Sequence, residues 1–125
     1  MIANTSGHQG ISIAHNNSNV EISSNTFSNA LGGVSIKTNN NNSGFKVQGN
    51  TFENATFGLT FSDGNVGTVN GNTFNGLGTA VSIFLTSGNV LTGAGNVISI
   101  GGTACGAAGV NPGSSITFTN GATCP

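Results

Sequence analysis

The sequence has very few charged residues and contains no arginine, tryptophan or tyrosine. Charged residues make up 4% of the chain, and its lysines are Lys37 and Lys46. Because no patch of lysine and arginine exists to neutralise phosphates, we expect no nucleic-acid partner. No apolar run reaches the length of about 18 residues typical of a transmembrane helix, so no transmembrane segment is expected. Surface carbohydrate stays open as a partner, although the side chains that best stack on sugar rings are missing.

What the chain does contain is glycine, asparagine and a moderate share of apolar residues. It has 21 glycines and eight phenylalanines, with 35% hydrophobic residues and a net charge of -1. A polar, charge-poor, glycine-rich chain is either disordered or built from stacked turns. Disordered chains combine low hydrophobicity with high net charge, so this composition favours stacked turns. A length of 125 residues is enough for one domain.

A tripeptide repeat sets the organisation of the chain. Asn-Thr-Phe occurs at Asn25-Thr26-Phe27, Asn50-Thr51-Phe52 and Asn72-Thr73-Phe74, and a degenerate copy stands at Asn96-Val97-Ile98. The copies are 25, 22 and 24 residues apart. A unit of this length that holds only short strand-like runs is typical of one turn of a β-solenoid.

Alignment on this motif gives three ranks of short strands in each repeat. The first rank alternates small, apolar, hydroxyl and apolar residues, and the third is the Asn-Thr-Phe series. Period two predicts strands with one buried face, and stacked copies would bond to each other about 4.8 Å apart. The first-rank strands are 10–13, 33–36, 58–61 and 80–83, and the second-rank strands are 20–22, 45–47, 67–69 and 91–93.

The alignment predicts columns of identical or similar side chains along the stack. Three inward columns form the expected core: Ile11, Val34, Leu59 and Val81; Ile13, Ile36, Phe61 and Ile83; and Phe27, Phe52, Phe74 and Ile98. A fourth column, Asn25, Asn50, Asn72 and Asn96, is expected at the bend before the third strand. Asparagine tolerates left-handed backbone angles there, and its amide can bond to the same amide one coil away. A solvated turn is the alternative interpretation of these asparagines.

The succession of strand, turn, strand, Gly/Ser-Asn-Thr-Phe, small residues, glycine and strand resembles the right-handed parallel β-helix repeat family. That family shares its architecture with pectate lyases, bacterial surface passengers and phage tailspikes. The resemblance covers about residues 9 to 100. It implies an all-β, right-handed parallel β-helix of about five coils, each of 22–25 residues. It implies no single function, because the fold hosts lyases, hydrolases, adhesins and structural fibres.

The last part of the chain departs from the repeat, so we divide the single domain into coils at 1–100 and a capping segment at 101–125. Cys105 falls in register with Val81, and Cys124 follows a last strand-like run. A Cys105–Cys124 disulfide would pin this segment over the end of the stack, contributing about 3 kcal/mol. Two free thiols or a metal site are the alternatives. The bridge would place the protein in an oxidising, extracellular or cell-surface location.

The other end of the stack has no evident cap. Asn4-Thr5-Ser6 resembles a truncated motif with Ser6 in the position of phenylalanine. The expected open edge comprises Asn4, Thr5, Gly10, Ile11, Ser12 and Ile13. An uncovered strand carries a row of unpaired N–H and C=O groups. We therefore expect either preceding coils of a longer parent chain or a second copy of this chain to dock there.

The residues that could carry chemistry do not converge in this alignment. Glu21 lies one coil from Lys46, where a surface ion pair is expected, and Glu53 falls beside Ser28 and Asn75. Asp63 opens a loop in register with His15 and Thr38, as a solvated carboxylate. His8 and His15 lack the spacing of metal ligands. We predict no catalytic residue, no metal and no cofactor.

Outward hydroxyl groups form two further ladders, at Ser12, Ser35, Thr60 and Ser82 and at Thr26, Thr51 and Thr73. An ice-binding face would need a flat double rank of threonine, and Lys37, Phe84 and Glu53 interrupt these faces. The leading hypothesis is a non-catalytic structural or adhesive β-helix module of an exported or surface protein. The alternatives are a remnant of a polysaccharide-active lyase or hydrolase, and an ice-binding β-solenoid.

Overall fold

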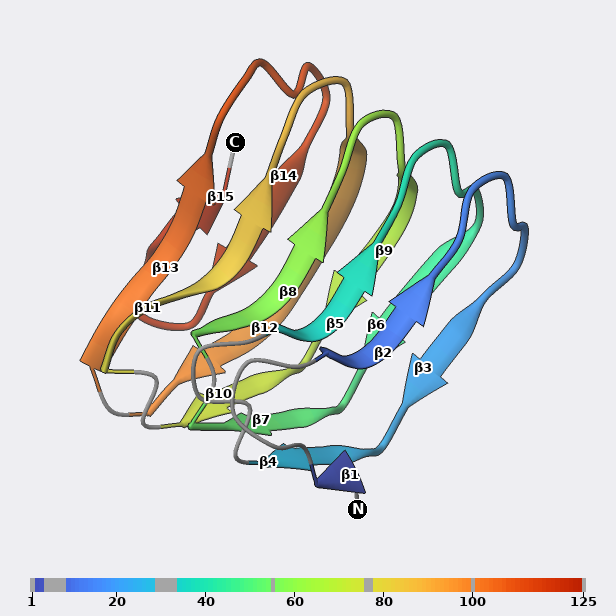
Figure 1. Cartoon of the computed structure of the whole chain (residues 1–125). Coiled ribbons are helices and arrows are strands. Elements are labelled where there is room, and N and C mark those ends of the chain that lie inside the picture. Colours follow the sequence, from blue (N-terminus) through green and yellow to red (C-terminus); the bar gives the residue numbers. More distant parts are fainter. Residues whose placement is uncertain are drawn as a thin grey trace.

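The computed structural model is a parallel β-solenoid without helices in its described parts, and it winds through about four turns (Figure 1). The structure describes residues 2–3, 9–28, 34–54, 56–75, 78–99 and 101–124. The expected all-β solenoid is confirmed, with about four turns in place of about five. Across these residues, no helix is present that has the length and apolarity to span a membrane.

The first strand of each coil stacks into a five-stranded parallel sheet in the order β13-β11-β8-β5-β2. Figure 1 shows these strands side by side, from β2 at the N-terminal end to β13 at the C-terminal end. In the three central strands, the alternate apolar side chains Ile36, Leu59 and Ile83 are fully buried, as expected from the period of two. The strands are β2 (Gln9–Ile13), β5 (Val34–Thr38), β8 (Phe57–Phe61), β11 (Gly78–Leu85) and β13 (Gly101–Ala107).

The second and third strands of each coil belong to one 10-stranded sheet, because β12 (Val90–Ile98) runs through both positions. The second-rank strands are β3 (Glu21–Ser23), β6 (Phe45–Gln48), β9 (Val66–Asn70) and β14 (Ser115–Phe118). The third-rank strands are β1 (Ile2–Ala3), β4 (Thr26–Ser28), β7 (Thr51–Glu53) and β10 (Thr73–Asn75). Among the named strands, the one antiparallel pair joins β14 to β15 (Thr123–Cys124).

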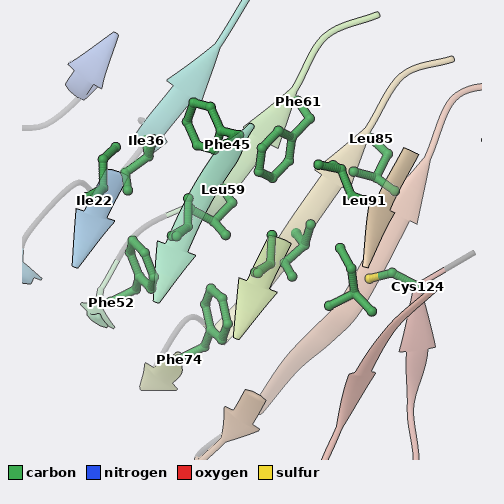
Figure 2. Close-up of a cluster of buried hydrophobic side chains, with 14 of the residues drawn as sticks. Ile22, Ile36, Phe45, Phe52, Leu59, Phe61, Phe74, Leu85, Leu91 and Cys124 are labelled. Atoms are coloured by element: carbon green, nitrogen blue, oxygen red, sulfur yellow. The ribbon is translucent and has the colours of Figure 1, made fainter. Parts of the chain in front are cut away.

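The predicted phenylalanine column forms the third wall of the core. Phe27 pairs with Phe52, Phe52 with Phe74, and Phe74 with Ile98. The rings stack with centroids 5.1 and 4.9 Å apart and planes inclined by 11° and 13°. Figure 2 shows Phe52 and Phe74 as neighbouring rings, with Leu59 and Ile36 above them in this view. Each fully buried side chain of this kind contributes roughly 1.5–3 kcal/mol.

The predicted register of the first-rank sheet is wrong by two residues in two coils. Ile11 pairs with Ile36 and not with Val34, and Leu59 pairs with Ile83 and not with Val81. A shift by two residues keeps every side chain on its own face, so the alternating pattern alone cannot detect it. The actual inward columns are Ile11, Ile36, Leu59, Ile83 and Cys105, and Ile13, Thr38, Phe61, Leu85 and Ala107.

A threonine can occupy this core column because its hydroxyl is bonded inside the sheet. Thr38 is 1% exposed, and its Oγ1 donates to the carbonyl oxygen of Thr60 at 3.0 Å. A buried hydroxyl without such a partner would cost free energy, whereas a bonded one is tolerated. The polar residue therefore does not interrupt the apolar interior.

The sharp bend before the third strand is made by the residue that precedes each asparagine. Ser24, Gly49, Gly71 and Gly95 have φ values of 58°, 62°, 59° and 70°. The expectation that the asparagines themselves adopt left-handed angles is wrong, because Asn25, Asn50, Asn72 and Asn96 follow these residues at negative φ. Glycine adopts positive φ without steric cost, which accounts for three glycines at this position.

The N-terminal strand occupies a different position from the one that the sequence suggested. In the structure, Ile2 pairs with Phe27 and Ala3 with Ser28. Ile2 therefore stands at the phenylalanine position of its coil, and the assignment of Ser6 to that position is wrong. Asn4, Thr5 and Ser6 lie outside the described residues.

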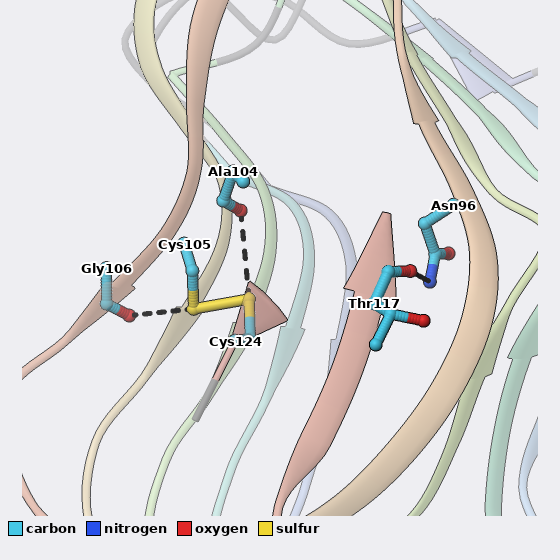
Figure 3. Close-up of a disulfide and its surroundings, with 6 residues drawn as sticks. All are labelled: Asn96, Ala104, Cys105, Gly106, Thr117 and Cys124. Carbon is cyan, nitrogen blue, oxygen red and sulfur yellow. Dashed lines mark hydrogen bonds between the residues drawn. A yellow bond between two sulfur atoms is a disulfide. The ribbon is translucent and has the colours of Figure 1, made fainter. Parts of the chain in front are cut away.

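The C-terminal segment closes its end of the stack with a hairpin and a disulfide. β14 continues the second-rank stack against β12, and β15 then returns antiparallel along the outer edge of β14. The predicted Cys105–Cys124 bridge links β13 to β15, as Figure 3 shows. Cys105 stands in register with Ile83, not with Val81 as expected, and Cys124 is fully buried.

Candidate functional site at the ends of the stack

The three acidic side chains lie on separate segments of the coil. Glu21 is on β3, Glu53 is on β7, and Asp63 is in the loop after β8. Glu53 is in register with Ser28 and Asn75, as predicted. Among the described residues, no three His, Cys, Asp or Glu side chains gather closely enough to hold a metal ion.

Glu21 and Lys46 are in register as predicted, but the polar contact of Glu21 is with a different residue. Gln48 Nε2 donates to Glu21 Oε1 at 3.0 Å. Gln48 and Lys46 lie on the same outward face of β6, where both are exposed. The described structure therefore shows a hydrogen bond from an amide to the Glu21 carboxylate at this place, and not the expected ion pair.

Asp63 links two successive loops, and the partners of its side chain are Thr86 and Ser87. Its Oδ1 accepts hydrogen bonds from Thr86 Oγ1, from the backbone N–H of Ser87 at 3.0 Å and from Ser87 Oγ at 3.2 Å. These donors, led by the Thr86 hydroxyl, lower the pKa of the Asp63 carboxyl below its ordinary value. The arrangement fastens one coil to the next, and the expected register with Thr38 is wrong because Thr38 pairs with Phe61.

The outward hydroxyls form one of the two ladders that the sequence suggested. Thr26, Thr51 and Thr73 stack in register on the outer face of the third-rank strands. On the first rank, Ser12 is followed by Lys37, Thr60 and Phe84, and Ser82 is fully buried. The predicted serine and threonine ladder of that rank is therefore wrong.

The predicted column of asparagines is present and forms what we call the corner ladder: Asn25, Asn50, Asn72 and Asn96. In each step, the backbone N–H and the Nδ2 of one asparagine both donate to Oδ1 of the next, at 2.9–3.3 Å. Nδ2 also donates back to the preceding coil, as from Asn50 to the carbonyl of Ile22 at 2.8 Å. Asn50, Asn72 and Asn96 are almost completely buried, so these bonds satisfy backbone groups that water cannot reach.

A second ladder, absent from the sequence-based predictions, runs through the loops between the first and second strands. This loop ladder consists of Asn17, Asn42, Asn65, Asn89 and Asn111. Its bonds have the same form, at 2.9–3.2 Å. The spacings of 25, 23, 24 and 22 residues nearly repeat those of the Asn-Thr-Phe motif. That spacing was a usable signal, but runs such as 39–42 contain several asparagines and hide which one repeats.

Both ladders are polar, because every bond between successive asparagines runs from the N–H groups of one residue to Oδ1 of the next residue toward the C-terminal end. The corner ladder is completed at its C-terminal end, where Asn96 Nδ2 donates to the carbonyl of Thr117 at 3.2 Å (Figure 3). The loop ladder is not completed, because the buried Nδ2 of Asn111 has no hydrogen-bond partner. The two ladders thus meet the C-terminal cap in different ways.

The N-terminal end of the stack is an uncovered sheet edge within the described residues. β2 and β3 are the end strands of their sheets. The carbonyl of Ile13 accepts from the N–H of Asn39 and so points toward β5. Alternate residues of a parallel strand bond to opposite neighbours, so the N–H and C=O of Ser12 point outward. Gly10, Ile11, Ser12 and Ile13, expected at an open edge, lie in this end strand.

Together, the fold and these ends define a parallel β-solenoid that is tied by two asparagine ladders. Among the described strands, β2 and β3 have an uncovered outer edge, whereas β15 covers the outer edge of β14. Comparisons with protein-family models, with curated proteins and with solved structures gave no match. Of the resemblance to the pectate-lyase-like β-helix family, the structure supports the parallel solenoid architecture.

Proposed function

We propose that this chain is a non-catalytic structural or adhesive β-solenoid module of an exported or cell-surface protein, which associates through its N-terminal edge. The observation that carries the proposal is the difference between the two ends of the second-rank stack. Within the described residues, no strand lies on the outer edge of β2 or β3, whereas β15 covers the outer edge of β14. An open edge of this kind is a template for pairing with another strand.

The rest of the molecule supports a scaffold rather than a catalyst. The three carboxylates occupy different segments. Asp63 accepts its hydrogen bonds from the next loop and so joins two loops. Most buried polar residues of the described interior are asparagines of the two ladders, whose amides bond to one another. The location outside the cell is supported by the Cys105–Cys124 bridge, because disulfides persist in oxidising compartments.

The association is tested by sedimentation velocity over a wide range of protein concentration. We expect oligomers to grow with concentration and to disappear in the variant Ser12→Pro. Proline removes the outward N–H and places its ring on the edge, while the bonds from β2 to β5 use the other residues of the strand. Ser12→Ala keeps the N–H and is the matched control, so it should associate like the unaltered chain.

Two results would overturn the proposal. A chain that stays monomeric at every concentration would contradict association through the N-terminal edge. Cleavage of an acidic polysaccharide by the chain, lost when Glu21, Glu53 or Asp63 is replaced by alanine, would show a polysaccharide-active enzyme instead of a scaffold.

A further inference from the structure

We infer that the edge which pairs with the N-terminal strands belongs to the C-terminal end of a second copy, and that β15 is the strand which has to leave for the two copies to stack. This inference rests on the proposed association. It adds that the copies stack head to tail, that the C-terminal end is the partner surface, and that β15 of the same chain competes for this surface. The first step of the argument is the polarity of the ladders.

In both ladders, each asparagine donates forward and accepts from behind. Asn17 and Asn25 are the first described members, so each has an Oδ1 that faces the open N-terminal end and could accept from a further coil. Two N-terminal edges brought together would place these acceptors against acceptors. A C-terminal edge instead offers donors, and a stack that continues head to tail keeps every bond of the repeat.

The C-terminal end carries a donor that lacks its acceptor. At every earlier step of the loop ladder, Nδ2 donates to an Oδ1 one coil further on, and at Asn111 this bond is missing although the atom is buried. A buried amide without a partner is costly. Beside it, Val110 is 77% exposed, the highest value among the large hydrophobic residues described. A further coil supplied by a second copy would give the Asn111 amide a hydrogen-bond acceptor and would cover the Val110 side chain.

The strands of the two ends also match. β2 and β13 are the opposite end strands of one parallel sheet, so β2 of a second copy would follow β13 as β11 follows β8. Ile11 would then lie over Cys105 and Ile13 over Ala107, which extends the inward columns. On the second rank, β3 of the second copy would place Ile22 over Ile116 of β14.

The obstacle to this contact is β15. It occupies the outer edge of β14, where Ile116 pairs with Cys124 and Thr117 with Thr123, and it runs antiparallel to the rest of the stack. Its two residues make a short pairing that the disulfide to Cys105 holds in place. β15 and the β3 strand of a second copy therefore compete for the same row of backbone groups.

The competition predicts that opening the disulfide strengthens association. The test compares the full chain before and after treatment with a phosphine. The phosphine supplies two electrons to break the S–S bond, and water supplies the oxygen of the phosphine oxide and the protons of the two thiols. Sedimentation velocity and circular dichroism are recorded in both states. We expect the reduced chain to stay β-structured and its association constant to rise about tenfold or more, because the bridge no longer favours the cap.

Two variants locate the partner surface. Ser12→Pro should abolish the gain on reduction, since it blocks the N-terminal edge. Asn111→Asp should weaken the association. The new carboxylate still accepts from Asn89, but its other oxygen would face the Oδ1 of Asn17 in the second copy, so two acceptors would meet. Asn120→Asp, an equal change of charge in the exposed hairpin turn of the cap, is the control and should leave association unchanged.

The outcomes separate this inference from the proposed function. Association that responds to Ser12→Pro, yet neither to reduction nor to Asn111→Asp, would show that two N-terminal edges pair with each other, and it would overturn the inference alone. If the chain loses its β structure on reduction, the oxidised Asn111→Asp variant decides, because normal association of that variant also contradicts the head-to-tail contact. No association in any state would overturn both proposals.

Discussion

The corner ladder and the loop ladder perform the same chemistry at two bends of each coil, yet they differ in their surroundings and in how they end. The corner ladder leads directly into the phenylalanine column and finishes on the Thr117 carbonyl. The loop ladder runs beside residues that vary from coil to coil and finishes on the unpaired amide of Asn111. In the loop ladder one asparagine per bend stays in register, although the spacing between successive members varies between 22 and 25 residues.

The largest expected effect concerns the column that follows the corner ladder. Phe52→Ala should lower the free energy of unfolding by about 3–5 kcal/mol, because it opens a cavity between two stacked rings. Thr51→Ala, on the outer face of the same strand, should cost well under that amount. Chemical denaturation of the two variants measures the difference. Equal losses would mean that the described face of β7 is wrong.

The next effect concerns the bridge that holds the cap over the corner ladder. Replacing both Cys105 and Cys124 with serine should lower the free energy of unfolding by about 3 kcal/mol, the value expected for a loop of this length. The loss should appear equally on reduction of the unaltered chain in the same denaturant titration. A doubly substituted variant as stable as the oxidised chain would show that the cap holds without its bridge.

Interior members of the two ladders should be equally important. Asn72 and Asn65 each make four ladder bonds or backbone bonds through their side chains. Asn72→Ala and Asn65→Ala should therefore each cost about 2–3 kcal/mol, since both leave buried groups unpaired. Denaturant titration of the two variants tests this. A negligible loss of unfolding free energy for Asn65→Ala alone would show that the loop-ladder bonds do not stabilise the fold.

The terminal members should differ, because the ladders end differently. Asn96→Ala removes bonds to Val69 and Thr117 as well as those from Asn72. Asn111→Ala removes only the two bonds that it accepts from Asn89, and it also removes an unsatisfied donor. We expect a cost of about 1 kcal/mol at Asn111, clearly below that at Asn96. Thermal unfolding of the monomeric chain would compare them, and the reverse order would contradict the assigned ladder ends.

The smallest expected effect is the pH dependence contributed by Asp63, in the loop next to the loop ladder. Its folded-state pKa is lowered mainly by the Thr86 hydroxyl, so its stabilising bonds are present above the ordinary pKa of 3.8 and are lost as the pH falls through the folded value. The stability advantage of the unaltered chain over Asp63→Asn should thus narrow below about pH 4. Thermal melts at pH 7, 5 and 3 measure it. Thr86→Val removes the main donor and should reduce the same pH dependence.

The parts of the fold that the sequence predicted are those in which residue identity and position repeat together. Asn25, Asn50 and Asn72 each stand before threonine and phenylalanine, so one motif gives both the corner ladder and the aromatic column. The two cysteines, the only ones in the chain, lie in the segment where the repeat stops, which was enough to predict the bridge. In these places the sequence allowed one register of the repeats and one pairing of the cysteines.

The parts that could not be predicted are those in which the pattern allows more than one alignment. The first-rank strands repeat with period two, so pairing Ile11 with Val34 or with Ile36 keeps the same face buried. The loop ladder resolves the ambiguity, because each of its asparagines stands four residues after the end of a first-rank strand, as Asn42 does after Thr38. The orphan amide of Asn111 depends on three-dimensional packing and has no signature in the sequence.

The most direct test of the account is a nuclear Overhauser measurement on the chain in solution. The account predicts cross-peaks between the ring protons of Phe52 and those of both Phe27 and Phe74, whose ring centroids lie 5.1 and 4.9 Å from that of Phe52. It also predicts contacts of the Asn65 side-chain amide with Asn42 and Asn89. Rings of Phe27, Phe52 and Phe74 that show no mutual contact, with the chain folded, would contradict the parallel stacking on which every other conclusion depends.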